Sequence, residues 1–319
     1  MTGAAGFIGS HVCDHWLASG HRVAGLDNFS TGRREFLEKA LGNPQFELFE
    51  LDLLDFEKTK SAMGRFKPEL VIHLAANADV RFGLNHPRKD LEQGTIVTFN
   101  VLESARLAGA KKFAYASTGS VYGEPTVFPT PETCPFPVQT SLYAASKLAG
   151  EGLIQSYAEG FGIKGYIFRF VSILGERYTH GHIFDFAKKI LDNPGQIEVL
   201  GDGRQRKAYL NIADCVRAIS HVVTTQNEKI NIFNLGPDEY IDVNGSLDII
   251  CHKMNVNPKR QYAGGSRGWI GDSPFIFLEC SKLKETGWKA QKTISESVEE
   301  TLHYLLGHRW LLGPQTEKS

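Results

Sequence analysis

The sequence predicts an α/β protein in which a doubly wound parallel sheet is followed by a smaller C-terminal α/β lobe. Short aliphatic runs alternate with longer amphipathic stretches through the first half of the chain, as in a parallel sheet with helices on both faces. A chain of 319 residues, of which 42% are hydrophobic and 22% charged, is able to bury a large core. After residue 171 the alternation loosens and glycine-rich loops become frequent, which indicates the smaller lobe.

Strands of the main sheet are predicted from β-branched and aliphatic runs at 21–27, 45–52, 69–75, 111–118, 163–170 and, late in the chain, 229–236. Helical patterns fall between them at 10–19, 33–41, 55–65, 88–109 and 140–160. In the second half, 211–223 and 293–306 are helical, while 201–207 and 264–274 are glycine-rich loops. We therefore expect a sheet domain of residues 1–171 and 208–236, with a smaller lobe of residues 172–207 and 237–319 over the carboxyl edge of the sheet.

Composition excludes several classes of partner. A formal net charge of −1 gives no reason to expect nucleic acid or an anionic membrane. No apolar run is long enough to span a bilayer, and the N-terminus lacks the layout of a signal peptide. The five cysteines lie far apart, which favours reduced thiols in a cytoplasmic protein over a disulfide frame or a zinc site. His180 and His182 have a spacing that suits a loop, so we expect no metal.

The glycine-rich turn GAAGFIG predicts a dinucleotide site. Gly3 permits a tight turn, Gly6 lets the backbone approach a pyrophosphate, and Gly9 lets the following helix pack against the sheet. The pyrophosphate would rest on the first N–H groups of that helix, around Phe7 and Ile8, where the helix dipole favours an anion. The pattern alone is weak, because similar turns also close strand–helix units that bind nothing.

Acidic residues at strand ends strengthen this prediction. Asp27 ends the next strand about 20 residues beyond the glycines, where a carboxylate accepts from both ribose hydroxyls. A carboxylate repels a 2′-phosphate, so NAD is favoured over NADP, although Arg33 and Arg34 follow closely. In the alternative interpretation Asp27 is only a turn former. The remaining NAD contacts are expected at the turn after Asp27 and at the ends of the next two strands: Asn28, Asp52, Leu53, Leu74, Ala75 and Ala76.

A tyrosine and a lysine four residues apart predict the chemistry, since Tyr143 and Lys147 share one face of a helix. An unperturbed tyrosine, with a pKa of about 10, is a poor base near neutrality. A lysine ammonium about 4–5 Å away would lower that pKa by roughly 2–3 units, and a positive nicotinamide ring would act in the same direction. Tyr143 would then be a general base for a substrate hydroxyl, with Thr118 bonded to the same oxygen. In the alternative interpretation, Tyr143 and Lys147 form only an ordinary contact on the surface of a helix.

Five segments together resemble one enzyme family. TGAAGFIGSH, LDNFSTGRRE, HLAANADVR, STGSVYGEP and YAASKLAGE are similar, in this order, to the extended short-chain dehydrogenase/reductase family, in its nucleotide-sugar epimerase/dehydratase branch. The resemblance implies a Rossmann fold, tightly held NAD, and a nucleotide-diphosphate sugar bound by the smaller lobe. It implies that Tyr143 is the base, that Lys147 binds the nicotinamide ribose and lowers the tyrosine pKa, and that Thr118 is the partner hydroxyl.

The branch of the family is predicted from the residues that follow Thr118. Dehydratases carry Thr-Asp-Glu where this chain has Thr118, Gly119 and Ser120, and decarboxylases usually carry Glu at the position of Ser120. Without that acid/base pair, loss of water from a 4-keto sugar lacks its proton shuttle. We expect an NDP-sugar 4-epimerase similar to those that act on UDP-glucose. The alternatives are another NDP-sugar enzyme, a 4-ketoreductase or 4,6-dehydratase, and a non-catalytic dinucleotide-binding module.

Cationic residues of the glycine-rich loops are expected to hold the diphosphate. They are Arg206 and Lys207 in GDGRQRKAYL and Arg267 in SRGWIGDSP. The family usually has arginine at the position of Lys207, so its bidentate role is open to Arg206. Ser172 stands where the family commonly has an asparagine near the substrate. In the alternative interpretation, each of these arginines is only a solvent-exposed charge that binds no phosphate.

The resemblance implies two further features. One is a homodimer formed through helices 88–109 and 140–160. The other is a central strand before Gly3, where this chain has only Met1 and Thr2. A missing central strand leaves unpaired backbone groups on both neighbours, at about 1–3 kcal/mol for each buried group. We therefore expect that the sequence starts too late, the alternative being a truncated product that binds coenzyme weakly.

Overall fold

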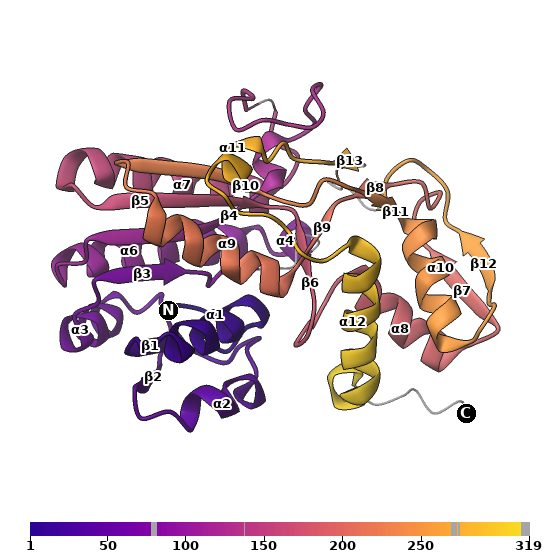
Figure 1. Ribbon diagram of the computed structural model, residues 1–319, viewed down its shortest axis with the longest axis horizontal. Helices are drawn as coiled ribbons and strands as arrows, with labels where there is room; N and C mark the ends of the chain where they lie inside the picture. The colour runs from indigo at the N-terminus through magenta and orange to yellow at the C-terminus, as the bar shows by residue number, and fades with distance from the viewer. Residues whose placement is uncertain (78–81, 137, 269–272, 274, 314–319) are drawn as a thin grey trace.

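The computed structural model describes residues 1–77, 82–136, 138–268, 273 and 275–313. A parallel sheet with helices on both faces forms its larger part, and most of the elements after residue 171, outside residues 212–235, form a smaller group beside it (Figure 1). No helix among the described residues is long and apolar enough to cross a membrane.

All six predicted strands of the main sheet are present and every pairing is parallel. They are β1 (Val23–Asp27), β2 (Phe46–Glu50), β3 (Leu70–His73), β4 (Lys112–Thr118), β5 (Lys164–Phe170) and β10 (Ile230–Leu235). β2 pairs with β1, and β3, β4, β5 and β10 follow one another in space. Thr2 lies between the two groups, with parallel bridges to Leu26 of β1 and His73 of β3. Met1 and Thr2 therefore occupy the position of the expected central strand.

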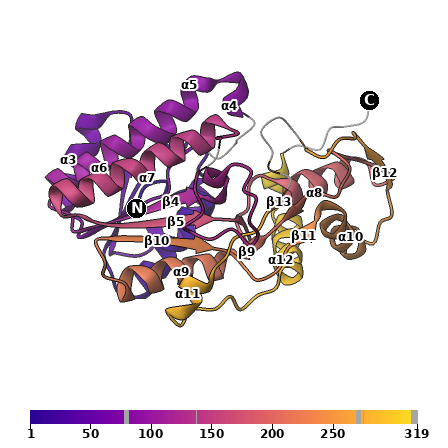
Figure 2. The same ribbon diagram turned by 90° about the horizontal axis from the view of Figure 1, so that it is seen from above.

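Helices cover both faces of this sheet (Figure 2). On one face α3 (Phe56–Phe66), α6 (Val97–Leu107) and α7 (Leu142–Phe161) share an apolar cluster with the strands. On the other face lie α1 (Phe7–Ala18) and α9 (Ile212–Thr225), beside the short η1 (Arg34–Leu37) and α2 (Glu38–Leu41). The predicted doubly wound parallel fold is confirmed.

The helix predicted at 88–109 is not continuous. It consists of α5 (Pro87–Asp90), a π-helical turn η2 (Leu91–Ile96) and α6, and a short α4 (Phe82–Asn85) precedes it. Gly94 lies inside the π-helical turn, where a Cβ would overlap the side chain of Ser146 on α7. The wider turn thus coincides with the closest approach of this helix to α7.

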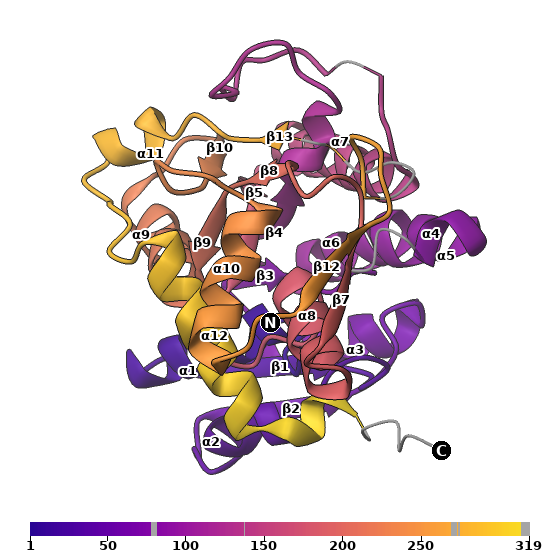
Figure 3. The same cartoon turned by 90° about the vertical axis from the view of Figure 1, so that its right-hand side faces the viewer.

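The smaller lobe contains more regular structure than the sequence predicted. Of the two predicted helices, 211–223 becomes α9 on the sheet and 293–306 becomes α12 (Ile294–Gly307). Two unpredicted helices, α8 (His182–Asp192) and α10 (Val243–Met254), pack beside α12 (Figure 3). Short strands complete the lobe: β6 (Ser172–Leu174), β7 (Gln196–Val199), β8 (Arg206–Lys207), β9 (Tyr209–Asn211), β11 (Ile241–Asp242), β12 (Lys259–Tyr262) and β13 (Phe275–Ile276).

The lobe meets the carboxyl ends of the sheet strands. Asn234, near the end of β10, donates through Nδ2 to the carbonyl oxygen of Glu279 at 2.9 Å, just before α11 (Ser281–Glu285). A Cβ on Gly119, which follows β4, would lie 3.3 Å from Ile276 of β13. This edge is where doubly wound sheets place their ligands. The domain boundaries at 171, 208 and 236 stay a prediction.

Candidate functional site

The glycine turn leaves room for a dinucleotide backbone. Gly3 has a φ of +66°, a conformation that favours glycine, and a Cβ there would lie 2.9 Å from the nitrogen of Ala75. A Cβ on Gly9 would overlap the carbonyl oxygen of Gly3, so α1 packs this close only because Gly9 has no side chain. Gly6 is the N-cap of α1 and offers no side-chain hydrogen bond, so the first N–H groups, around Phe7 and Ile8, suit a pyrophosphate.

Asp27 ends β1 and its carboxylate faces the glycine turn. Its Oδ2 accepts from the Ala5 N–H at 2.9 Å and its Oδ1 from the Phe29 N–H at 2.8 Å. Burial raises the pKa of Asp27, and these backbone hydrogen bonds oppose the rise. Each carboxylate oxygen accepts more than one hydrogen bond, so the group fits a ribose diol. Beside it, Asn28 Nδ2 donates to Asp52 Oδ2 at 3.3 Å, which brings two further predicted coenzyme residues together.

The end of β3 also meets the glycine turn. The Leu74 N–H donates to the carbonyl oxygen of Thr2 at 3.3 Å, and Ala75, followed by Ala76, lies against Gly3. Leu53 differs from the other predicted contacts, because its side chain is buried in the core and its carbonyl oxygen accepts from Asn100 at 2.9 Å.

The three candidate catalytic residues lie together at the carboxyl end of β4. Thr118 is the last residue of β4, and its hydroxyl lies close enough to that of Tyr143, in the first turn of α7, to lower the pKa of the phenol. Thr118 also accepts from the Ser120 N–H at 3.1 Å, which places it at the start of η3 (Gly119–Tyr122). Lys147 follows one turn after Tyr143, and its Nζ donates to the Ala116 carbonyl oxygen at 2.7 Å.

The electrostatics of this group differ from the prediction that Lys147 lowers the pKa of Tyr143. Burial raises the pKa of Tyr143 to about 12, Asp90 adds to the rise, and the hydrogen bond from Thr118 opposes it. Burial also lowers the pKa of Lys147 to about 7. The lysine Nζ is 5.9 Å from the centre of the Tyr143 ring and is bound to Ala116 instead. In the coenzyme-free chain the lysine is therefore poorly charged and does not activate the tyrosine.

The cations predicted for the diphosphate lie on both faces of β8. Successive side chains of a strand point to opposite faces, so Arg206 and Lys207 diverge. The Arg206 guanidinium lies 4.0 Å from the centre of the Phe275 ring. Lys207 donates to the carbonyl oxygen of Ser273, in the same loop as Arg267, which is ion-paired with Glu124. Lys207 and Arg206 thus have different neighbours, Ser273 for the lysine and the Phe275 ring for the arginine.

The region that follows Lys207 reaches Ser172 and His182. Ser172 of β6 is in register with Tyr209 of β9. The ring of Tyr209 stacks on His182 with centroids 4.7 Å apart. His182, expected in a loop, is the first residue of α8, and burial followed by the charge of Lys207 lowers its pKa to about 3. Sequence reasoning missed that the charge of Lys207 acts on His182, because the two residues lie on elements 25 positions apart in the chain, α8 and β8.

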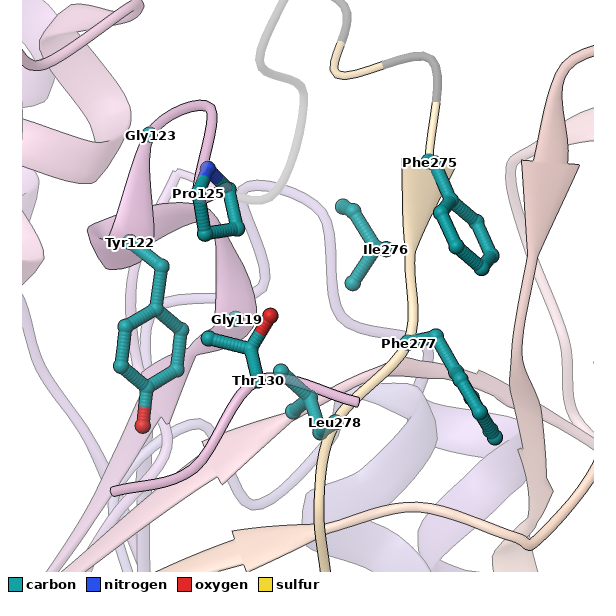
Figure 4. A pocket seen from close by; sticks show the side chains of 9 residues that line it. All are labelled: Gly119, Tyr122, Gly123, Pro125, Thr130, Phe275, Ile276, Phe277 and Leu278. Atoms are coloured by element: carbon teal, nitrogen blue, oxygen red, sulfur yellow. The ribbon is translucent and has the colours of Figure 1, made fainter. Parts of the chain in front are cut away.

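A small apolar pocket lies beside the candidate catalytic residues, between the segment that follows β4 and the segment that contains β13 (Figure 4). Gly119, Tyr122 and Thr130 line one side, and Ile276 and Leu278 line the other. A Cβ on Gly119 would be 3.3 Å from both Ile276 and Leu278, which is tight for any side chain. The place where a dehydratase would carry aspartate is therefore closed by apolar groups.

Comparison with known proteins tests the family prediction. Residues 1–236 match the NAD dependent epimerase/dehydratase family. The UDP-glucose 4-epimerase of Mycolicibacterium smegmatis is 36% identical over 310 residues, which cover 95% of this chain and 97% of that protein.

Two solved structures extend the likeness to the fold. The UDP-glucose 4-epimerase of Thermus thermophilus in complex with NAD has a TM-score of 0.84 and 32% identity, and the match covers 96% of this chain and 98% of that chain. The UDP-glucose 4-epimerase of Thermotoga maritima with UDP-glucose has a TM-score of 0.87 and 29% identity, with 97% and 98% covered.

These matches confirm the predicted fold and coenzyme. The relatives extend over nearly the whole chain, and one of the solved structures contains NAD. The glycine turn, the carboxylate of Asp27 and the open start of α1 fit that coenzyme. The protein is an NAD-dependent nucleotide-sugar epimerase. The chain belongs to the NAD-dependent epimerase/dehydratase family.

Proposed function

We propose that this protein interconverts UDP-glucose and UDP-galactose by inversion at C4 of the sugar. One observation carries the proposal: Thr118, Tyr143 and Lys147 meet at the end of β4, while Gly119 and Ser120 supply no acid/base pair for elimination. UDP-glucose appears in the names of several relatives of similar length, among them one that is 36% identical, and this supports the choice of sugar.

The proposed reaction uses these residues as follows. Bound NAD accepts a hydride from C4 and returns it to the other face. Tyr143, as phenolate, accepts the proton of the 4-hydroxyl and gives it back after the sugar has turned over. Thr118, whose side chain lowers the pKa of Tyr143, holds the reacting oxygen between the two hydroxyls. Lys147, four residues further on α7, orients the coenzyme ribose and contributes charge when the site is occupied.

Lys207 and Arg267 are the proposed diphosphate ligands; the hydrogen bond of Lys207 to Ser273 and the ion pair of Arg267 with Glu124 support this choice, because Glu124 and Gly123, which accepts from Ser273, are adjacent in the chain. Arg206 is assigned a stacking role instead, because Phe275 and Tyr240 cover its guanidinium. The sheet domain (1–171 and 208–236) would bind NAD and the smaller lobe (172–207 and 237–319) the nucleotide sugar.

We further propose a homodimer formed through the outer faces of α6 and α7. Six large apolar side chains of these helices and of η2 are exposed: Leu91, Ile96, Phe99, Leu107, Leu142 and Phe161. Exposed apolar side chains gathered on neighbouring helices are typical of a protein–protein contact. A second copy of this chain supplies a matching face.

The test is a Tyr143→Phe variant that is loaded with NAD and supplied with UDP-glucose. Loss of one general base lowers turnover by about 10²–10⁴-fold. NMR of the C4 configuration measures turnover, and denaturation followed by coenzyme assay measures the NAD that stays bound. Tyr304→Phe, on α12, is the control and should behave as the wild type. Wild-type protein that holds NAD but does not invert UDP-glucose would contradict the proposed substrate, and unchanged turnover in Tyr143→Phe would contradict the assigned base.

A further inference from the structure

A completely buried ion pair lies behind the candidate catalytic residues. Glu151 of α7 and Arg169 of β5 have side chains that are 0% and 3% exposed. Arg169 binds the carboxylate with two nitrogens, Nε to Oε1 at 3.0 Å and Nη2 to Oε2 at 2.7 Å. A buried ion pair loses the hydration of both charges, so its net contribution to stability is small or unfavourable. Its presence here therefore calls for a reason other than stability.

The pair connects the two elements that carry the reacting groups. Glu151 lies one helical turn after Lys147 and two turns after Tyr143 on α7. The hydroxyl of Ser117, the residue before Thr118 on β4, donates to Glu151 Oε1 at 2.5 Å. The carboxylate thus joins the end of β4 to α7, one residue before Thr118.

Arg169 extends this connection to η3 and to the segment around Glu132, which follows η3 in the chain. Its Nη1 donates to the Tyr122 hydroxyl at 2.8 Å and to the Glu132 carbonyl oxygen at 3.1 Å. Tyr122 in turn donates to Asn234 Oδ1 at 2.8 Å, at the end of β10. Both Tyr122 and this segment border the apolar pocket of Figure 4. One guanidinium therefore fixes α7, η3 and the loop beyond it to the sheet.

We propose that Ser117, Glu151 and Arg169 are positioning residues of the epimerase reaction, which hold the start of α7 against the end of β4 so that Tyr143 and Thr118 share one substrate oxygen. The inference rests on the proposed function. None of the three side chains needs to contact substrate. They act through the placement of Thr118, the residue after Ser117 on β4, next to Tyr143, which shares α7 with Glu151.

The sharpest test removes one oxygen. Ser117→Ala breaks the bond between β4 and Glu151 and leaves the ion pair intact. We expect kcat to fall at least tenfold with KM within twofold, and the acid limb of the kcat–pH profile to move to higher pH because Tyr143 loses support from Thr118. The matched control is Ser104→Ala on α6. Ser104 is also fully buried, and its hydroxyl has no hydrogen-bond partner among the described residues.

A second variant tests the ion pair without a lone buried charge. Glu151→Gln combined with Arg169→Met removes both charges at once, a change that folded proteins often tolerate. We expect this double variant to fold and to bind NAD, with kcat reduced at least tenfold and the same shift in the pH profile. If either variant loses only thermal stability and keeps the wild-type kcat and profile per NAD-bound site, the three residues are structural and the inference is wrong.

A readout without turnover separates this inference from the proposed substrate. In NAD-loaded protein with ¹³Cζ-labelled tyrosine, the signal that disappears in Tyr143→Phe reports the environment of the Tyr143 hydroxyl. We expect this signal to move in Ser117→Ala and to stay in place in Ser104→Ala. That result would support the positioning role even if UDP-glucose were not turned over. Equal signals in both alanine variants would overturn it.

Discussion

Lys147 shows how burial and chemistry oppose each other at a single residue. Its Nζ is buried and donates to Ala116, and burial lowers its pKa to about 7. An unfolded lysine has a pKa of about 10.4, so between about pH 7 and pH 10 the unfolded chain binds a proton that the folded chain lacks. The free energy of unfolding of the coenzyme-free protein should therefore rise with pH in this window. Below about pH 7 the destabilising contribution of Lys147 is at its largest.

Replacement of this lysine tests the sign of the effect. Coenzyme-free Lys147→Met should unfold at a higher temperature than the wild type near pH 7, and the difference should shrink towards pH 10, where the neutral amine carries no penalty. Thermal unfolding at several pH values measures this. Lys289→Met, at an exposed position, should show no such trend. A gap between Lys147→Met and the wild type that does not change with pH would show that the charge of Lys147 is not the cause.

At the residue scale, the sequence predicted where residues lie in the fold better than it predicted their protonation or the direction of their side chains. Gly3 and Gly9 were found from spacing because a tight turn and a close helix impose local rules. In the coenzyme-free chain burial raises the pKa of Tyr143, an effect that depends on how deeply α7 packs, and the lowered pKa expected beside NAD stays a prediction. Arg206 and Lys207 could not be assigned to faces without the register of β8. Arg169 offered a signal that was not used, namely a charge inside an apolar strand pattern.

At the scale of elements, the contact between η2 and α7 sets the place of the candidate base. A Cβ on Gly94 would lie 2.6 Å from the Cβ of Ser146 and would overlap its hydroxyl. The same hydroxyl donates to the Tyr143 carbonyl oxygen at 2.8 Å. Gly94→Ala should therefore push α7 away and lower kcat about tenfold or more, together with the midpoint of thermal unfolding.

The control for this variant lies on α7, the helix that η2 contacts. A Cβ on Gly152 of α7 would have nothing within 4 Å. Gly152→Ala should stabilise the protein by up to about 1 kcal/mol through helix propensity alone, with turnover unchanged. Paired measurements of kcat and thermal unfolding compare the two variants. Equal turnover in Gly94→Ala and the wild type would mean that α7 does not depend on this close approach.

The elements themselves were predictable where one period persists long enough. All six sheet strands were found within two residues of their ends, because apolar residues either dominate or alternate in each of these short runs. The break in the helix at 88–109 could not be foreseen, since its cause is a neighbour on α7. α8 was missed because Gly181 gives it no side-chain cap, and strands of two to four residues around it leave little periodicity to detect.

At the scale of the whole molecule, the site lies where the two parts of the chain meet. The sheet supplies the glycine turn, Thr118 and Tyr143, and the smaller lobe supplies Lys207, Ser273 and the wall of β13. The sheet half follows from strand–helix alternation, which the sequence displays. The half formed by the smaller lobe depends on pairings between short strands distant in sequence, such as β8 with β11 and β13. Long-range pairing of this kind is not encoded in any local pattern.

The proposed dimer gives a prediction at this largest scale. Leu107 on α6 is 50% exposed, and Phe161 on α7 is 56% exposed, so both have room for a charge in the monomer. Buried in a dimer, Leu107→Glu would place an unpaired carboxylate in the apolar contact, which costs several kcal/mol and separates the copies. Leu41→Glu on α2, where the leucine is 41% exposed, should leave the dimer intact. Sedimentation of both variants at micromolar concentration measures the mass, and a wild type that sediments as a monomer would exclude this interface.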